Sequence, residues 1–337
     1  MPPPPVDQID QPVNILLTGD VMLGRGVNSY LLRRGPFYPW GDTLPVLKAA
    51  DFTIINLESV IARNGQPWAR WPKVFHFRAD PVAITSLESA GIDCVALANN
   101  HVLDFEEEAL KEMLALLDKS GIKHAGAGLN LDDARKPVLL ENQKLKLAIV
   151  AFTDNEPGWA ATANKMGINY LEISTTEESL NVLRQSINQS RTSGADLVMF
   201  TVHWGPNMVE RPSLLFQQFA HAVMDAGVDI FHGHSSHIFQ GIEIYKGKTI
   251  IYDAGDFVDD YAVDPTLRND RGLMYRLSVA DKKVKEVELL PVFISRCQVN
   301  LATGTQREKT AERIRAMSAE MGTDVRSSDS RLWIDVQ

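Results

Sequence analysis

The sequence VNILLTGD, residues 13–20, is a mostly apolar run that ends in a glycine and an aspartate. A run of this length, bounded by Gly19, is typical of a strand buried inside a sheet. Asp20 is therefore predicted at the carboxyl end of a buried strand, where α/β proteins usually build their sites.

The same arrangement returns along the chain, each time with a polar side chain of a metal-ligating type directly after an apolar run. Four further runs show it: residues 51–57 before Glu58, residues 94–98 before Asn99-Asn100-His101, residues 197–202 before His203, and residues 228–231 before the segment that contains His234 and His237. Five strands that each deliver such a residue at the same end indicate a shared rim.

Helical patterns lie between these runs. Helices are predicted at residues 81–90, 106–120, 176–190 and 214–226, and a glycine that can cap the helix follows each one. This alternation predicts an α/β protein. After His237 the pattern changes to antiparallel strands at residues 242–245, 248–252, 272–280 and 284–293, a helix at 306–321 and a closing strand at 332–336.

One large domain is expected, because the candidate site residues run from Asp20 to His237 and a single site therefore needs most of the 337-residue chain. We predict a disordered N-terminal segment at residues 1–12 and a catalytic domain at residues 13–300. A C-terminal helix and strand at residues 301–337 are predicted to pack on that domain.

Composition argues against several classes of function. A net charge of −9 disfavours nonspecific binding to nucleic acid, which needs a basic face.

The sequence has neither a secretory signal pattern nor the roughly twenty apolar residues of a transmembrane helix, so we expect a cytoplasmic protein without an integral membrane segment. The two cysteines, Cys94 and Cys297, indicate buried thiols and no disulfide framework. The oligomeric state stays open.

The polar side chains at the predicted rim match the ligands of a metal centre. Carboxylates, an asparagine carbonyl and imidazoles suit one or two divalent ions of Mn, Fe or Zn, and two ions about 4 Å apart can activate a shared hydroxide. The candidate ligands are Asp20, Glu58, Asn100, His203, His234 and His237. In this interpretation Asp20 binds one ion and Glu58 bridges the pair. Asn100 and His203 bind the other ion, and His234 and His237 complete the pair.

Single residues of this set also have purely structural explanations. Asp20 could cap a helix, Glu58 could pair with an arginine at the surface, and His203 could be a satisfied core histidine. The segment 231–237 is more specific, because it holds three of the eight histidines. Which two of these three bind metal stays open.

Four more polar residues are candidates for chemistry, substrate binding or the rim. His101 could donate a proton to a leaving group, and Asp104 could orient His101 or cap the helix that begins near Phe105. Arg25 is a candidate contact for acidic or phosphate groups. Asp256 follows a strand directly, so it could also lie at the rim.

Six stretches, in this order, resemble the CapA family, which is named for the synthesis of poly-γ-glutamate capsules and is related in fold to calcineurin-like metallophosphoesterases. They are residues 18–25 (TGDVMLGR), 56–58 (NLE), 98–101 (ANNH), 124–128 (HAGAG), 203–205 (HWG) and 233–237 (GHSSH). The resemblance implies a four-layer α-β-β-α metallophosphoesterase-like sandwich whose loops enclose one or two divalent ions. It also implies a γ-glutamyl or other acidic substrate.

Two positions depart from the pattern of these families. Calcineurin-like enzymes carry a histidine two residues after the first aspartate, where this chain has Met22. The first metal is therefore expected to lack one ligand. Relatives commonly carry asparagine where this chain has Asp256, which could supply a compensating ligand.

Three functions compete at this point. The first is a metal-dependent hydrolase that cleaves a γ-glutamyl amide bond, in the metabolism of a capsule or another γ-linked polymer. The second is a metallophosphoesterase that cleaves a phosphoester. The third is a non-catalytic component of polymer synthesis or export with a vestigial metal site, although such a protein has no reason to keep costly polar groups buried. The fold alone does not separate them.

Overall fold

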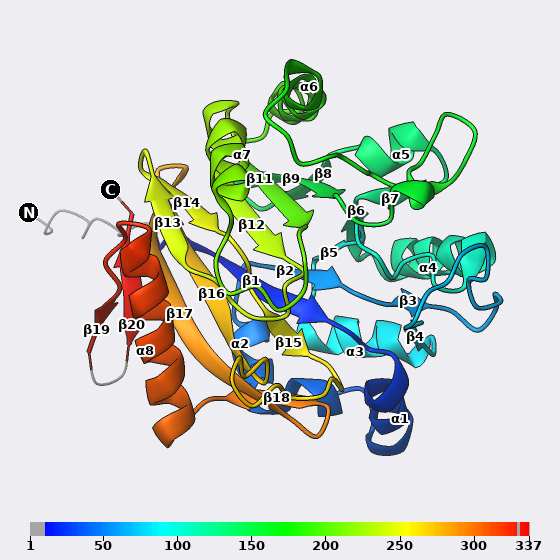
Figure 1. Ribbon diagram of the computed structural model, residues 1–337, viewed down its shortest axis with the longest axis horizontal. Coiled ribbons are helices and arrows are strands. Elements are labelled where there is room, and N and C mark those ends of the chain that lie inside the picture. The colour runs from blue at the N-terminus through cyan, green and yellow to red at the C-terminus, as the bar shows by residue number, and fades with distance from the viewer. Residues whose placement is uncertain (1–10, 329–330, 337) are drawn as a thin grey trace, which may run out of the picture.

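The computed structural model describes residues 11–328 and 331–336 of the 337-residue chain. The predicted disordered segment, residues 1–12, lies outside the described residues except for Gln11 and Pro12, which are exposed. Two β-sheets packed face to face form the centre of the described chain (Figure 1).

The larger sheet has ten strands. On one side, β1 (Val13–Val21), β2 (Phe52–Leu57), β5 (Cys94–Ala96) and β6 (Lys123–Ala125) pair in parallel, in that order. On the other side, β1 is followed by β16 (Arg271–Ala280), β17 (Lys283–Ser295), β20 (Leu332–Asp335) and β19 (Arg326–Ser327), all antiparallel. Two short strands complete the sheet: β15 (Asp256–Val258) pairs with β1, and β18 (Gln298–Leu301) pairs with β17.

The smaller sheet has six strands, in the order β13 (Ile242–Tyr245), β14 (Lys248–Ile251), β12 (Ile230–His234), β11 (Leu197–His203), β9 (Lys146–Thr153) and β8 (Val138–Glu141). Its four inner strands run parallel, whereas β13 and β8 at its edges are antiparallel to their neighbours. Two small pairs lie apart from both sheets: β3 (Val60–Ile61) with β4 (Arg78–Ala79), and β7 (Ala127–Gly128) with β10 (Gly167–Ile168).

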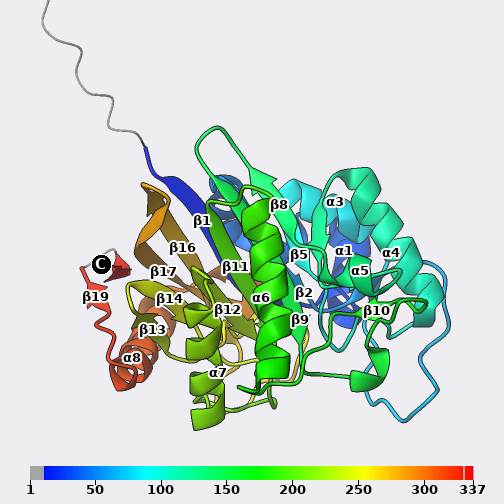
Figure 2. The ribbon, with the colours of Figure 1, turned by 90° about the horizontal axis from the view of Figure 1, so that it is seen from above.

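Helices cover the outer faces of both sheets (Figure 2). On the larger sheet these are α1 (Arg25–Arg34), α2 (Leu44–Lys48), α3 (Val82–Ala90) and α4 (Glu106–Ser120). On the smaller sheet they are α6 (Glu177–Thr192) and α7 (Leu214–Asp225). The remaining helices are α5 (Leu131–Arg135) beside β7, α8 (Gly304–Glu320), and the 3-10 turns Tyr38–Thr43 and Pro157–Trp159. The four layers confirm the predicted α/β class and the α-β-β-α sandwich.

Apolar side chains of the facing strands fill the space between the two sheets. Leu17 and Ile54 from the larger sheet and Leu147, Met199 and Ile230 from the smaller one belong to one buried cluster. Burying an aliphatic side chain of this size stabilises the fold by roughly 1.5–3 kcal/mol. Because many such side chains interlock, the rims of the two sheets are fixed relative to each other.

The predicted helices are found within two residues of their expected bounds, and Gly91 and Gly121 end α3 and α4 in the left-handed conformation of a capping glycine. The sequence prediction omits β9, although its run KLAIVAFT has the pattern of a buried strand and Asp154 follows it directly. Cys94 is buried as expected, whereas Cys297 is only half-buried, so that expectation is wrong.

Beyond the predicted domain boundary, the C-terminal residues join the larger sheet. β20 pairs with β17, and α8 contributes Ala311, Ile314 and Met317 to the core between the sheets. Among the described residues, no helix combines the length and the apolar character that crossing a membrane requires.

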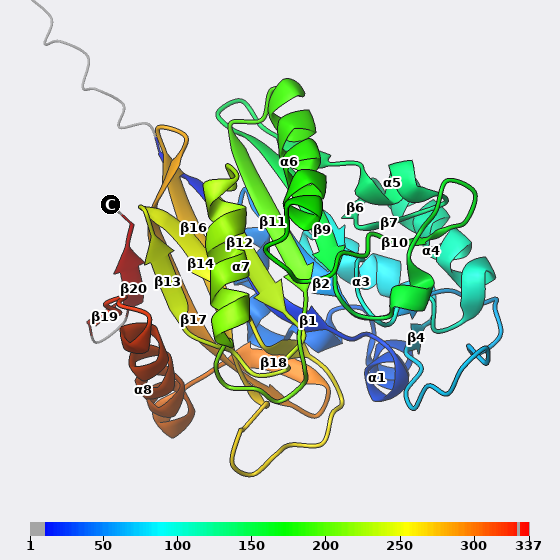
Figure 3. The ribbon, with the colours of Figure 1, turned by 45° about the horizontal axis from the view of Figure 1, so that its top comes forward.

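Strand register decides which side chains lie next to each other at the rim, where β1, β11 and β12 end close together (Figure 3). Asp20 is the register partner of Asn56 on β2 and of Asp256 on β15, and His203 is the partner of His234. β15 reaches β1 because Gly19 has no side chain: a Cβ there would lie 1.8 Å from the carbonyl oxygen of Gly255.

We predict that Gly19→Ala lowers the free energy of unfolding by at least about 2 kcal/mol, since backbone would have to move to admit the methyl group. Gly194→Ala is the control, because its φ of +86° makes alanine unfavourable but no atom lies within 4 Å of the new Cβ. That control should cost roughly 1 kcal/mol. If urea titrations show the same loss of unfolding free energy in the two variants, the close approach of Gly255 to Gly19 is contradicted.

Candidate metal centre

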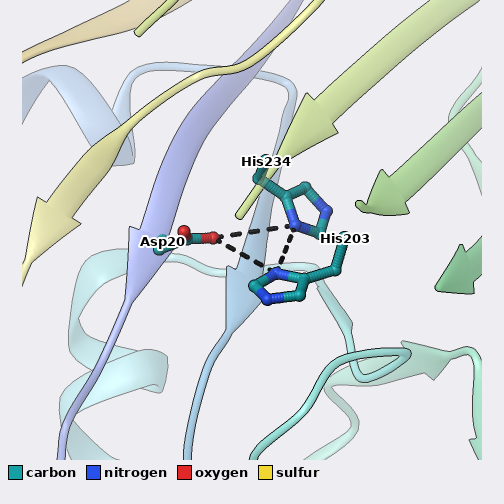
Figure 4. Close-up of side chains that lie close together, drawn as sticks. All are labelled: Asp20, His203 and His234. Atoms are coloured by element: carbon teal, nitrogen blue, oxygen red, sulfur yellow. Dashed lines mark hydrogen bonds and ion pairs between the residues drawn. The ribbon is translucent and has the colours of Figure 1, made fainter. Parts of the chain in front are cut away.

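One group of possible metal ligands joins the two sheets. Asp20 lies one residue before the end of β1, His203 ends β11 and His234 ends β12. All three side chains are almost fully buried (Figure 4). Asp20 Oδ1 lies 3.8 Å from His203 Nδ1 and 3.6 Å from His234 Nδ1, and the two Nδ1 atoms are 3.0 Å apart. Donor atoms this close can share one ion.

A second group uses the other oxygen of Asp20. It consists of Asp20, Glu58, His237 and Asp256, whose donor atoms all lie within 4.8 Å of one another. His237 Nδ1 is 2.9 Å from Asp256 Oδ1 and 3.4 Å from Asp20 Oδ2. Asp20 is therefore the residue common to both groups.

Unpartnered atoms provide the test of whether these residues fit a metal. Among the described residues, several buried donor atoms have no hydrogen-bond partner: Asp20 Oδ2, Glu58 Oε1, Asn100 Oδ1, His203 Nε2 and Asp256 Oδ2. A buried polar atom without a partner is costly and needs an explanation. Oxygens and imidazole nitrogens gathered at one place suit divalent Mn, Fe or Zn, so the residues fit the expected ion.

Burial and charge set the protonation of the ligands. Burial lowers the pKa of His203 to about 3 and that of His234 well below its ordinary value, so both rings stay neutral, as metal binding requires. Burial alone would lower the pKa of His237 too, but the charges of Asp256 and Glu58 raise it well above its usual range. Burial, followed by the charge of Asp20, raises the pKa of Glu58.

A chain of hydrogen bonds fixes the orientation of His234. The carbonyl oxygen of Thr18 can only accept, so His232 donates to it from Nε2 at 2.9 Å and leaves Nδ1 as an acceptor. Thr201 Oγ1 donates to that Nδ1 at 3.1 Å and accepts from His234 Nε2 at 3.0 Å. The lone pair of His234 is therefore on Nδ1, which points at Asp20. Both nitrogens of His232 are already engaged, so His232 supports the ligand without being one.

The two consecutive asparagines have different roles. Asn99 donates from Nδ2 to Asn56 Oδ1 and to the carbonyl oxygen of Leu57, and its Oδ1 accepts from the amide of His101. Its side chain is thus fully used in holding the loop. Asn100 Oδ1 has no partner within the described chain, and Asn100 lines the same cavity as His101, which leaves it available to a metal.

His101 lies beside the metal ligands and is held by Asp104. The two are joined by a 2.6 Å contact between His101 Nδ1 and Asp104 Oδ2, while His101 Nε2 lies 3.7 Å from Glu58 Oε1. The imidazole also stacks on Phe77 at 3.9 Å between ring centroids. Burial lowers the pKa of His101 well below its ordinary value and raises that of Asp104 to about 7. Asp104 orients His101 and makes no cap to α4.

Besides Thr201, sequence reasoning missed two further residues whose side chains contact those of the proposed ligands. Asn56 donates to Asp20 Oδ1 at 2.7 Å and lies 3.3 Å from His203 Nδ1. Its position as a polar residue inside an apolar strand was the available signal. Tyr261 donates to Glu58 Oε2 at 3.1 Å, and it comes from a loop with no local sequence signal. Asn56 and Tyr261 both orient carboxylates.

The structure excludes the purely structural explanations of the rim residues. The helix that follows β1 begins after Gly24, so Asp20 does not cap it. Glu58 is fully buried and cannot be a surface residue. His203 has an Nε2 without a partner among the described residues, unlike a satisfied core histidine.

Met22 is buried in the outer core, with its sulfur accepting the amide of Gly24, so it offers no ligand.

A cavity of about 880 Å³ opens onto the ligands. Arg25 lines it in an unusual backbone conformation, with a φ of +46° that few residues other than glycine adopt. Asp260 binds the guanidinium through Nε and Nη2, and the charge lies 4.8 Å from the ring centre of Phe77 and 5.5 Å from that of Tyr261. Among the described residues, no hydrogen bond involves the remaining Nη1 group.

We predict that Thr201→Val weakens metal binding by about 10-fold to 100-fold, because the Thr201 hydroxyl fixes the tautomer of His234. Thr249→Val is the matched control, since Thr249 is also buried and its hydroxyl has no hydrogen-bond partner among the described residues. Metal content after dialysis, measured by mass spectrometry, tests this. Equal retention by the two variants would exclude the role of Thr201.

Comparisons with known proteins agree with this geometry. The chain is 32% identical to a "Probable polyglutamine synthesis accessory protein" of Mycobacterium tuberculosis, over 93% of each chain. It is 28% identical to "Capsule biosynthesis protein CapA" of Bacillus anthracis, over 74% of this chain and 61% of that one. A crystal structure of a hypothetical protein from Thermus thermophilus shares the fold with a TM-score of 0.50, at 16% identity, over 83% of this chain and 98% of the other.

The family model described as "Bacterial capsule synthesis protein PGA_cap" matches residues 14–261, which include nearly all of β1, every proposed metal ligand and Tyr261. These residues form both sheets around the rim and most walls of the cavity. Together with the relative that is similar over nearly its whole length, this match shows that the chain belongs to the PGA_cap family of bacterial capsule synthesis proteins.

Proposed function

We propose that this protein is a metal-dependent hydrolase that cleaves a γ-glutamyl amide bond in the metabolism of a capsule or a related γ-linked polymer. The observation that carries the proposal is the convergence of unpartnered, buried ligand atoms of the described residues with the His101–Asp104 pair, beside a cavity that Asn100, His101 and His237 line. Such clusters of perturbed, buried groups are typical of catalytic sites.

In this proposal, Asp20, Glu58, Asn100, His203, His234 and His237 hold one or two divalent ions, with Asp256 as a further candidate ligand. When bound, such ions polarise a carbonyl or phosphoryl oxygen and lower the pKa of water. His101 donates from Nδ1 to Asp104, so its neutral ring turns the lone pair of Nε2 towards the ligands. At Nε2 it takes up the proton that the attacking water loses and passes that proton to the departing amine. Asp104 holds the His101 ring in place through Nδ1, and the stacking of Phe77 excludes water from one face of the ring.

Two cationic side chains support an acidic substrate. Arg25 has one guanidinium nitrogen that Asp260 does not engage, which suits a carboxylate. Lys73 lines the same cavity, although its ammonium already contacts the Asn100 carbonyl oxygen at 2.7 Å and lies 3.4 Å from Asp104. The names of the relatives point the same way, because they refer to capsule and polyglutamine synthesis.

A phosphoester is the second candidate substrate, favoured by the metallophosphoesterase-like sandwich and by the same nitrogen of Arg25, which suits phosphate equally well. Assays of the metal-loaded protein with a γ-glutamyl oligomer and with an aryl phosphate separate the two. Release of amine from the oligomer supports the proposal, and hydrolysis of the aryl phosphate alone replaces it. Inactivity towards both substrates favours the non-catalytic assembly role.

We predict that His101→Ala retains its metal but loses turnover by about 100-fold to 10,000-fold, the usual contribution of a general acid or base. His124→Ala is the control, because His124 also belongs to a family-like stretch but pairs with Asp118 on the protein surface. Metal content and initial rates should be measured on the same samples. Normal turnover by His101→Ala would remove its proposed role.

We further predict that Arg25→Ala raises KM for an acidic oligomer by about 10-fold, a loss of roughly 1.4 kcal/mol of binding, with a smaller effect on kcat. Arg33→Ala provides the comparison, because Arg33 lies on the same helix α1 but is exposed and outside the cavity. An unchanged KM in Arg25→Ala would show that the substrate carboxylates bind elsewhere.

A further inference from the structure

The two groups of donors around Asp20 differ in chemistry. The group of Asp20, His203 and His234 offers one carboxylate and two imidazoles. The group of Asp20, Glu58, His237 and Asp256 offers three carboxylates and one imidazole. The first group is therefore rich in nitrogen, and the second is rich in oxygen.

We infer that the centre holds two unequal ions, and that Asp256 completes an oxygen-rich position that is more selective for Mn²⁺ relative to Zn²⁺ than the nitrogen-rich position is. This inference rests on the proposed metal centre. It assigns Asp256 to one of the two positions and adds a metal preference. Hard carboxylate oxygens suit Mn²⁺, whereas imidazoles suit Zn²⁺ and Fe²⁺.

The backbone places Asp256 in the oxygen-rich group. β15 pairs in parallel with β1, and in this register Asp256 is the direct partner of Asp20. The amide of Asp20 also donates to the carbonyl oxygen of Gly255 at 2.8 Å, which holds the two strand ends together. A side chain on Gly19 would prevent this approach. The position of the Asp256 carboxylate beside Asp20 is therefore built into the larger sheet.

The side chain of Asp256 is that of a ligand, as a comparison with its neighbour Asp253 makes clear. Both carboxylates are buried. Asp253 accepts backbone amides with both oxygens, from Ser236 at 2.9 Å and from Gly255 at 2.8 Å, which is a structural role. Among the proposed ligands, Asp256 contacts only His237, and it does so through Oδ1. Its Oδ2 has no hydrogen-bond partner among the described residues.

Absolute affinity is a poor measure of this preference, because Zn²⁺ generally binds more tightly than Mn²⁺ to any given set of ligands. The quantity that differs between the two positions is the ratio of the two dissociation constants. Each position must therefore be studied alone. His203→Ala removes a ligand found only in the nitrogen-rich group, and Asp256→Ala removes one found only in the oxygen-rich group.

The experiment measures stoichiometry and affinity for Mn²⁺ and for Zn²⁺ by equilibrium dialysis with mass spectrometry. The unaltered protein should bind two ions per chain, and each variant one. The ratio of the Mn²⁺ to the Zn²⁺ dissociation constant should be at least about 10-fold smaller in His203→Ala than in Asp256→Ala, on the scale of ligand effects in metal sites. Asp256→Asn keeps the volume of the side chain and one oxygen, so it should still bind two ions. The preference of its oxygen-rich position should shift from Mn²⁺ towards Zn²⁺.

Asp259→Asn controls for the loss of a buried carboxyl group, because Asp259 is buried in the same segment and belongs to neither group. This variant should bind two ions, and the ratio of the Mn²⁺ to the Zn²⁺ dissociation constant should be unchanged at both positions. If Asp259→Asn loses an ion as Asp256→Ala does, the loss of any buried carboxyl group in this segment has this effect, and the assignment of Asp256 is wrong. Two ions in Asp256→Ala, or equal ratios at both positions, overturn the inference but leave the proposed hydrolase intact. If the unaltered protein binds no ion, both are overturned.

Discussion

The structure depends on how it buries the charged and polar side chains around Asp20 that could bind a metal. Three carboxylates and three imidazoles lie at one rim, almost all of them out of contact with solvent, and several of their atoms have no partner within the described chain. Removing such groups from water costs several kcal/mol each unless a counter-charge or a metal compensates. A fold that keeps them there must hold the backbone firmly enough that the groups cannot separate and become solvated.

The sandwich provides that firmness by joining its two sheets at the rim as well as in the core. The carbonyl oxygen of Thr18 on β1 accepts from His232 on β12, and Asn56 on β2 contacts both Asp20 and His203. The bond between His232 and Thr18 and the contact between Asn56 and His203 run from one sheet to the other. The orientation of His234 therefore depends on the packing between the sheets, so that damage to the core would also disturb the ligands.

Much of this could be predicted from the sequence, because the physical causes are local. An apolar run that ends in Asp20 or His203 places the side chain at a strand end whatever the rest of the fold does. Partnerships across the sheets are different. Asp256 stands beside Asp20 through a pairing between residues more than two hundred positions apart, and Tyr261 reaches Glu58 from an irregular loop. No periodicity in the sequence encodes such contacts, and the choice between His232 and His234 required the hydrogen bonds themselves.

The strand ends and the loops form different parts of the site. Strands fix the ligands, whereas the cavity walls come from irregular segments around Phe75 and Val263, both largely exposed. Loops tolerate change far better than the strands that they connect. Relatives can therefore keep the rim and differ in the walls, so the family assignment bears on the metal centre more strongly than on the substrate. In this chain the walls combine the apolar side chains of Phe75, Phe77 and Val263 with charged side chains of both signs: Arg25, Lys73, Glu156 and Asp264.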